Sequence, residues 1–93
     1  MIKSFRDSNA ERIFTRQFVR KFPREIQQRV FMKLNAIDAA TALGDLRLPH
    51  SNRLESLKGD RKGQYSIRIN DQWRICFLWQ DGHAEQVEIV DYH

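Results

Sequence analysis

Residues 63–79 read GQYSIRINDQWRICFLW, and this stretch decides the fold of the chain. Polar and apolar residues alternate on both sides of a short polar break, which is typical of two half-buried strands joined by a turn. If both apolar rows face the same side, Ile69 must pair with Trp73 or Ile75, and the loop must be odd, most simply residues 70–72. We therefore expect an antiparallel hairpin with one apolar face.

In the three-residue register, Arg68 lies directly across from Arg74 on the polar face of this hairpin. Two cations in opposite positions destabilise a sheet unless an anion lies between them. The pattern leaves two interpretations open. Either this face binds phosphate, or the two arginines fan apart into solvent.

The length and composition bound the class of protein. Ninety-three residues, 41% of them apolar, predict one domain with a modest core over residues 1–93. No apolar run is long enough to cross a bilayer, and Lys3 and Arg6 interrupt any signal-peptide pattern, so we expect a cytoplasmic protein without a membrane partner. A single cysteine, Cys76, excludes an internal disulfide and fits a reducing compartment.

The charges are unevenly distributed. Sixteen Lys and Arg stand against twelve Asp and Glu, which suits a polyanionic partner. Residues 1–47 carry ten cations and five anions, whereas residues 80–93 carry four anions and no Lys or Arg. Basic charge therefore belongs to the predicted helices, the loop and the central hairpin.

The first half of the chain predicts a short strand at residues 1–5 and then two helices. Ser8 and Glu11 have the spacing of a capping box, so the first helix should begin near Asn9. It should continue to Pro23, because apolar and basic residues recur at helical intervals. The apolar set, which we expect to pack in the core, is Ile13, Phe14, Phe18 and Phe22, and the basic stripe is Arg12, Arg16 and Arg20.

The second helix should end at Gly44 and pack with the first on the apolar face of the sheet. Its buried residues should be Ile26, Val30, Leu34 and Ile37. Residues 44–63 form a long loop, which is typical of a functional or disordered segment. Leu54 and Leu57 should hold its middle as a short extended piece and deliver Lys58 beside the hairpin. A turn at Asp81 and Gly82 precedes a last strand from about Ala84.

The candidate site residues are cations and proton-transfer groups rather than metal ligands. The three histidines are scattered and the cysteine is single, so we expect no metal and no cofactor. The candidates are Glu55, Lys58, Arg68, Arg74, Asp91, Tyr92 and His93. Such a set suits RNA cleavage, in which the 2′-hydroxyl attacks the adjacent phosphate while fixed cations stabilise the added charge. Histidine titrates near neutrality, which makes His93 the first candidate for proton transfer, and arginine offers a fork for phosphate oxygens. Chemistry alone leaves open a domain that binds RNA without cutting it.

Three motifs carry a resemblance to a known family: RLESLKGD at 53–60, SIRINDQWR at 66–74 and the final VDYH. Together with MIKSF at the start and AIDAAT near the end of the second helix, they resemble the HigB branch of the RelE-like bacterial toxins. The resemblance implies an α+β fold of order β-α-α-β-β-β with a concave basic face. It also implies a metal-independent endoribonuclease that cuts messenger RNA in the A site of the 70S ribosome. Its partner would be a helix-turn-helix antitoxin (HigA-like), and it would meet operator DNA only through that antitoxin.

Matched residue by residue, the resemblance assigns roles to the candidates. Lys58 and Arg74 would lie on the scissile phosphate, and Asp91, Tyr92 and His93 would form the acid-base and positioning group. Further RNA contacts are expected from Glu55, Arg61, Lys62 and Arg68. Some relatives carry a catalytic histidine where this chain has Glu55. Nearby cations favour the charged form of a carboxylate, so Glu55 is expected to be a weak base or purely structural.

Two other functions compete with the nuclease. ParE-like relatives share the fold and inhibit DNA gyrase by binding, and an inactive RNA-binding module is a third possibility. Lys58 and the terminal Asp91-Tyr92-His93 favour the nuclease, because a protein that only binds has no need of those groups. Which group is the base and which the acid stays open.

Overall fold

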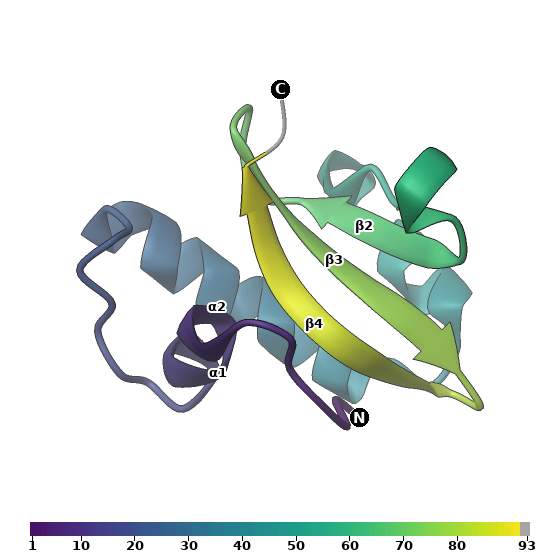
Figure 1. Ribbon diagram of the computed structural model, residues 1–93, viewed down its shortest axis with the longest axis horizontal. Coiled ribbons are helices and arrows are strands. Elements are labelled where there is room, and N and C mark those ends of the chain that lie inside the picture. The colour runs from purple at the N-terminus through teal and green to yellow at the C-terminus, as the bar shows by residue number, and fades with distance from the viewer. Residues whose placement is uncertain (92–93) are drawn as a thin grey trace.

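An antiparallel sheet of four strands, in the order β1-β2-β3-β4, forms the centre of the molecule (Figure 1). This computed structural model describes residues 1–91. The strands are β1 (Glu55–Ser56), β2 (Gln64–Arg68), β3 (Trp73–Gln80) and β4 (His83–Asp91). The helices are α1 (Ser8–Phe14) and α2 (Arg24–Ala39), with three short 3-10 turns, η1 (Leu43–Arg47), η2 (His50–Asn52) and η3 (Gly59–Arg61). Neither helix in this part of the chain has the length and apolarity needed to span a membrane.

The central hairpin has the predicted register. Arg68 is the partner of Arg74 in the β2–β3 ladder, and Ile69 N donates to Trp73 O at 2.9 Å. The loop of residues 70–72 is closed by Asn70, whose side-chain oxygen accepts from the backbone N–H groups of Gln72 and Trp73 at 2.9 and 2.8 Å. An Asx turn of this kind explains why a three-residue loop suits this sequence.

The core lies between the apolar face of the sheet and the two helices (Figure 1). Val30, Leu34 and Ile37 follow one stripe of α2 and are fully buried, as the helical spacing predicted. They meet the sheet residues Ile67, Ile75, Phe77 and Val87, which are also fully buried. The opposite face of the sheet carries the polar residues of the hairpin and is left for the candidate site.

Residues 1–5 do not form the continuous strand that was predicted. They run beside β4 through two isolated parallel bridges, Ile2 with Ala84 and Phe5 with Val87. Between these bridges β4 bulges at Gln86, which has a positive φ of 52° and donates its N–H to Ser4 Oγ at 2.9 Å. The bulge interrupts the ladder, so the first segment covers the edge of the sheet without becoming a full strand.

The first helix starts one residue early and ends far short of the prediction. Asp7 rather than Ser8 is the N-cap, and its two carboxylate oxygens accept from Asn9 N at 2.9 Å and Ile89 N at 3.3 Å. The helix stops at Phe14, because the Thr15 hydroxyl bonds back to the last turn and Arg16 adopts a left-handed φ of 65°. The predicted basic stripe therefore does not form.

Residues 15–23 do not form a helix, and the buried side chain of Gln27 bonds to their backbone at Val19 and Phe22. Gln27 accepts from Val19 N and donates to the carbonyl oxygens of Val19 and Phe22, at 2.7 to 2.8 Å. Phe18, predicted to be in the core, is consequently 60% exposed. Pro23 becomes the N-cap of α2.

The second helix also ends early, at Ala39 rather than at Gly44, and the chain continues as η1. The long loop is ordered around Asn52, which is buried and donates to the carbonyl oxygens of Leu46 and Leu48 at 3.1 and 3.3 Å. The short extended piece predicted near Leu54 and Leu57 is confirmed as β1.

Candidate active site

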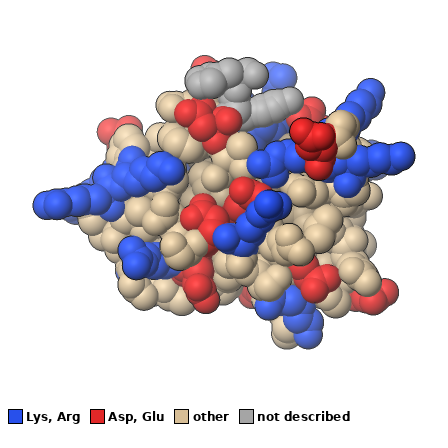
Figure 2. Space-filling view, in the orientation of Figure 1, with Lys and Arg blue, Asp and Glu red and all other residues tan. Residues whose placement is uncertain are grey.

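A pocket of about 550 Å³ opens on the polar face of the sheet, where β1 and the following loop meet β2, β3 and the end of β4. It brings together five of the predicted site residues, Glu55, Lys58, Arg61, Arg74 and Asp91. Figure 2 shows Lys and Arg side chains gathered over β2 and η3 at one end of the molecule and over the segment between the helices at the other. The pocket lies at the first of these ends.

Arg74 is fixed by the fold. It is only 9% exposed, its Nε donates to Ser66 Oγ at 2.8 Å, and its Nη2 donates to Arg53 O at 2.7 Å. Arg53 has a left-handed φ of 45°, which turns the chain after η2 and aims this carbonyl at the guanidinium. The interpretation of two arginines fanning into solvent is therefore wrong for Arg74.

Glu55 supplies a negative charge beside Arg74. Its Oε1 lies 3.7 Å from Arg74 Nη2, and the carboxylate stays half-exposed at the pocket wall. The contact places Glu55 against a cation of the site and supports the structural alternative for this residue.

Arg61 is tied to the sheet by a network that the sequence did not predict. Its Nη1 lies 3.2 Å from Glu88 Oε2 and 3.0 Å from Gln64 Oε1, and Arg6 approaches the same Glu88 oxygen at 3.7 Å. Glu88 pairs with Cys76 across β3–β4, and Cys76 pairs with Ser66 across β2–β3. This row across three strands forms the floor on which Arg61 and Arg74 are held.

Lys58 and Asp91 reach the pocket from its two rims. Lys58 is the exposed N-cap of η3, whereas Asp91 ends β4, pairs with Trp73 and accepts from Gln72 Nε2 at 3.3 Å. Lys62 is exposed but does not line the pocket. Tyr92 and His93 lie outside the described residues, so their predicted roles stay predictions.

Arg68 lies apart from this pocket although it is the ladder partner of Arg74. Its Nη2 forms an ion pair with Asp71 in the hairpin loop, and it lines a separate groove beside α2. Its predicted contact with RNA remains a prediction, but such a contact would involve the groove beside α2 rather than the pocket around Arg74.

Cys76 lines the pocket without being a reactive thiol. The residue is buried, and burial raises the pKa of its thiol above the ordinary value of 9.0. The neutral form therefore prevails at physiological pH, and a neutral thiol is a poor nucleophile. Within residues 1–91, no group of three or more His, Cys, Asp or Glu is placed to hold a metal ion.

Comparison with known sequences identifies relatives over the whole chain. Residues 3–93 match the model of a family described as "RelE-like toxin of type II toxin-antitoxin system HigB". "Toxin HigB-1" of Vibrio cholerae is 49% identical over 65 residues, which cover 70% of this chain and 68% of that protein. "Endoribonuclease HigB" of Proteus vulgaris is 37% identical over 93 residues, all of both chains.

Solved structures share the fold at low sequence identity. A mutant of YafQ from Escherichia coli has a TM-score of 0.66 at 12% identity, covering 98% of this chain and 91% of its own. YoeB in its heterotetrameric complex with YefM from Staphylococcus aureus has a TM-score of 0.63 at 19% identity, covering 100% and 98%. The α+β architecture that the resemblance implied is thus confirmed. By its sequence over nearly its full length and by its fold, the chain belongs to the HigB-like family, the RelE-like toxins of type II toxin-antitoxin systems.

Proposed function

We propose that this chain is a toxin endoribonuclease that cuts messenger RNA in the A site of the 70S ribosome, without a metal ion, and so blocks translation. The observation that carries the proposal is the 550 Å³ pocket in which Lys58, Arg74, Glu55 and Asp91 come together. The Proteus vulgaris relative, which matches over its whole length, is named an endoribonuclease.

Arg74 is suited to stabilise charge on the scissile phosphate. The 2′-hydroxyl attacks phosphorus, and the negative charge that builds there is best met by donors already held in position. Contacts with Ser66 Oγ and Arg53 O hold the guanidinium in place before RNA arrives. Lys58, exposed on the rim, adds a cation on a flexible four-carbon stem.

Proton transfer would fall to the end of β4. We assign Asp91 to this group from its position at the pocket, and we keep Tyr92 and His93 in it as predictions from the resemblance. Glu55, where the resemblance implies that some relatives carry histidine, is paired with Arg74 and would position that cation. Among residues 1–91, few acid-base groups line the pocket, which supports a requirement for the ribosome.

As a member of a type II toxin-antitoxin family, the chain has an antitoxin as its partner. We propose that this antitoxin is a helix-turn-helix protein (HigA-like) through which the toxin meets operator DNA. The toxin itself would act in the cytoplasm, where it meets ribosomes.

Primer extension on a defined transcript tests the proposal. With translating ribosomes and the wild-type toxin, we expect cleavage within codons, and we expect intact transcript when ribosomes are omitted. Lys58→Ala should reduce cleavage in the same assay without unfolding the protein, since Lys58 is exposed. Intact transcripts together with DNA-damage signalling would instead favour inhibition of gyrase.

A further inference from the structure

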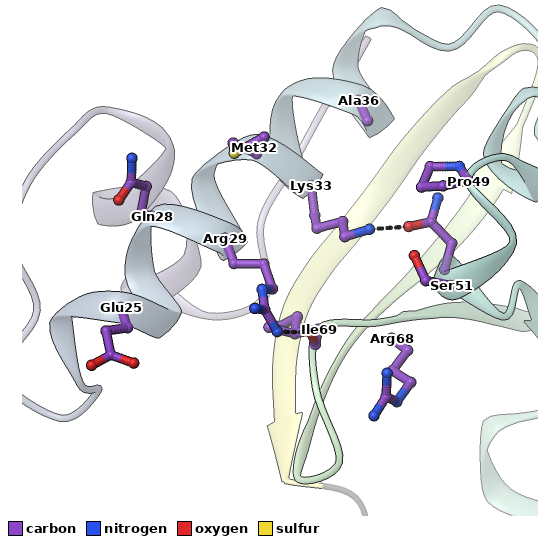
Figure 3. Close-up of a pocket in the computed structure, with 11 residues that line it drawn as sticks. Glu25, Gln28, Arg29, Met32, Lys33, Ala36, Pro49, Ser51, Arg68 and Ile69 are labelled. Carbon is purple, nitrogen blue, oxygen red and sulfur yellow. Dashed lines mark hydrogen bonds between the residues drawn. The ribbon is translucent and has the colours of Figure 1, made fainter.

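A second hollow of about 740 Å³ lies between α2 and the loop that contains η2. We call it the α2 groove; Figure 3 shows α2 along one side, the loop along the other, and Ile69 between them. Its central lining residues are Arg29, Met32, Lys33, Pro49, Arg68 and Ile69. Except for Arg68, none of these is a predicted site residue, and the catalytic pocket shares no lining residue with the groove.

Three cations and one carboxylate, Glu25, line the groove, so its lining is positive on balance. Arg29 Nη1 donates to Ile69 O at 3.1 Å, and Lys33 Nζ donates to the Asn52 side chain (Figure 3). Arg68 is paired with Asp71, whose side chain is otherwise in solvent. Burial and the neighbouring Arg29 lower the pKa of Lys33, which means that the ammonium lies in unfavourable surroundings. A carboxylate from a partner would relieve them.

Apolar side chains accompany these cations. Met32 is 65% exposed, and Leu48, next to Pro49 on the loop side, is 64% exposed. They are two of the four large apolar residues that are strongly exposed in residues 1–91. Exposed apolar side chains beside a hollow mark a surface that a protein partner covers. A phosphate backbone could pair with the cations but offers nothing to cover Met32, which lines the groove.

We propose that the α2 groove docks the antitoxin, through a segment that presents apolar side chains flanked by carboxylates. The inference rests on the proposed function only in taking the antitoxin as the partner. A stable complex buries about 1,200–2,000 Å² in total, so the groove would be one anchor of a larger interface. Its occupant would also engage Arg68, the ladder partner of Arg74, and would take that cation away from RNA.

Binding measurements test the groove directly. The toxin is prepared with Lys58→Met, which removes an exposed catalytic candidate, and is titrated with the antitoxin encoded beside its own gene. Met32→Glu and Lys33→Glu should each raise Kd by about tenfold or more, because each sets a negative charge against the proposed carboxylates. Arg20→Glu is the matched control, since Arg20 is an exposed cation on residues 15–23, away from the groove. Its Kd should change little.

A growth assay separates this inference from the proposed function. In the otherwise wild-type chain, Met32→Glu should still arrest growth when expressed alone and should no longer be neutralised by the co-expressed antitoxin. Met32 is exposed, so the variant should fold, and its thermal melt checks this.

An unchanged Kd for both groove variants overturns the proposal, as does an equal loss of affinity with Arg20→Glu. Loss of ribosome-dependent cleavage with unchanged antitoxin affinity would make the groove an RNA surface instead. If Lys58→Met remained fully toxic, the catalytic assignment would fail while the groove proposal stood.

Discussion

Arg68 and Arg74 are ladder partners in β2 and β3 and each lies beside a carboxylate, yet they differ in burial and in how they are held. Arg74 is buried against the floor of the candidate pocket and bonds to a hydroxyl and a backbone carbonyl. Arg68 has a side chain that is 30% exposed and pairs with a loop aspartate that is fully in solvent. One cation is fixed by the fold, and the other is held by a partner that water or a ligand can replace.

The difference has a physical consequence for function. A guanidinium whose orientation is set before substrate binds stabilises developing charge without rearranging in the reaction. An exposed ion pair contributes little to stability and exchanges readily, which suits a surface that binds and releases a partner. On the proposed function and the proposed antitoxin groove, Arg74 marks a catalytic side of the molecule and Arg68 a docking side, and the following predictions test that division.

The largest expected effect is on the fixed side. Arg74→Ala should lower the rate of ribosome-dependent cleavage by about 10²–10³-fold, because the donors prepared for the phosphate are lost. Arg68→Ala should lower it by about fivefold or less. Single-turnover cleavage of messenger RNA on programmed ribosomes measures both, with circular dichroism to check folding. If both variants lowered the cleavage rate equally, Arg74 and Arg68 would not differ in function.

A smaller effect is expected from the residue that orients Arg74. Ser66→Ala removes the acceptor of Arg74 Nε and leaves a buried charged donor without that bond, so unfolding should become easier by about 1.5–3 kcal/mol. Cleavage should fall less than in Arg74→Ala, and Ser66→Thr should restore part of it. Denaturant unfolding gives the stability, and wild-type stability in Ser66→Ala would show that the hydroxyl does not hold Arg74.

The fold was largely predictable because its strongest signal is periodic. Alternation in residues 65–79 fixes which side chains share a face, and the two apolar rows then fix the register. The end of α1 was not predictable in the same way. Phe18 and Phe22 continue the helical spacing, but Gln27, from the next helix, captures the backbone of residues 15–23. A contact between residues from two different segments does not appear as a repeating pattern in the sequence, so it could not be predicted from spacing.

The charged residues of the candidate site could be predicted, but the side chains and carbonyls that hold them could not. Lys58, Arg74 and Asp91 were identified chiefly through family resemblance, and the structure brings them to one pocket. The carbonyl of Arg53 depends on a left-handed turn at a non-glycine residue, for which the sequence has no local signal. Alternation predicts that Ser66 lies on the polar face. The bulge in β4 shifts the register of its pairing with β3, so the sequence did not predict that Glu88 lies on the same face, beside Arg61.

A more modest effect is expected from Glu55. Glu55→Gln keeps the shape of the side chain and removes the charge beside Arg74, so cleavage should fall by about tenfold or less if Glu55 only positions that cation. The pH–rate profile should keep its form. A loss as large as that of Arg74→Ala, with one limb of the profile removed, would make Glu55 the general base instead.

The smallest effect separates the two sides by pH. Burial raises the pKa of the Cys76 thiol, beside the candidate pocket, in the folded protein. As pH rises, the thiol of the unfolded chain loses its proton first, so the free energy of unfolding falls above the ordinary pKa of 9.0. Burial and Arg29 lower the pKa of Lys33 on the docking side, so the unfolded amine keeps its proton longer, and stability rises with pH up to the ordinary value of 10.5. Urea unfolding from neutral pH to about pH 10 should therefore show opposite changes in the two variants. With Cys76→Ala, the free energy of unfolding should no longer fall at high pH, and with Lys33→Gln it should no longer rise. If both variants changed the pH profile of stability in the same way, Cys76 and Lys33 would not differ in this respect.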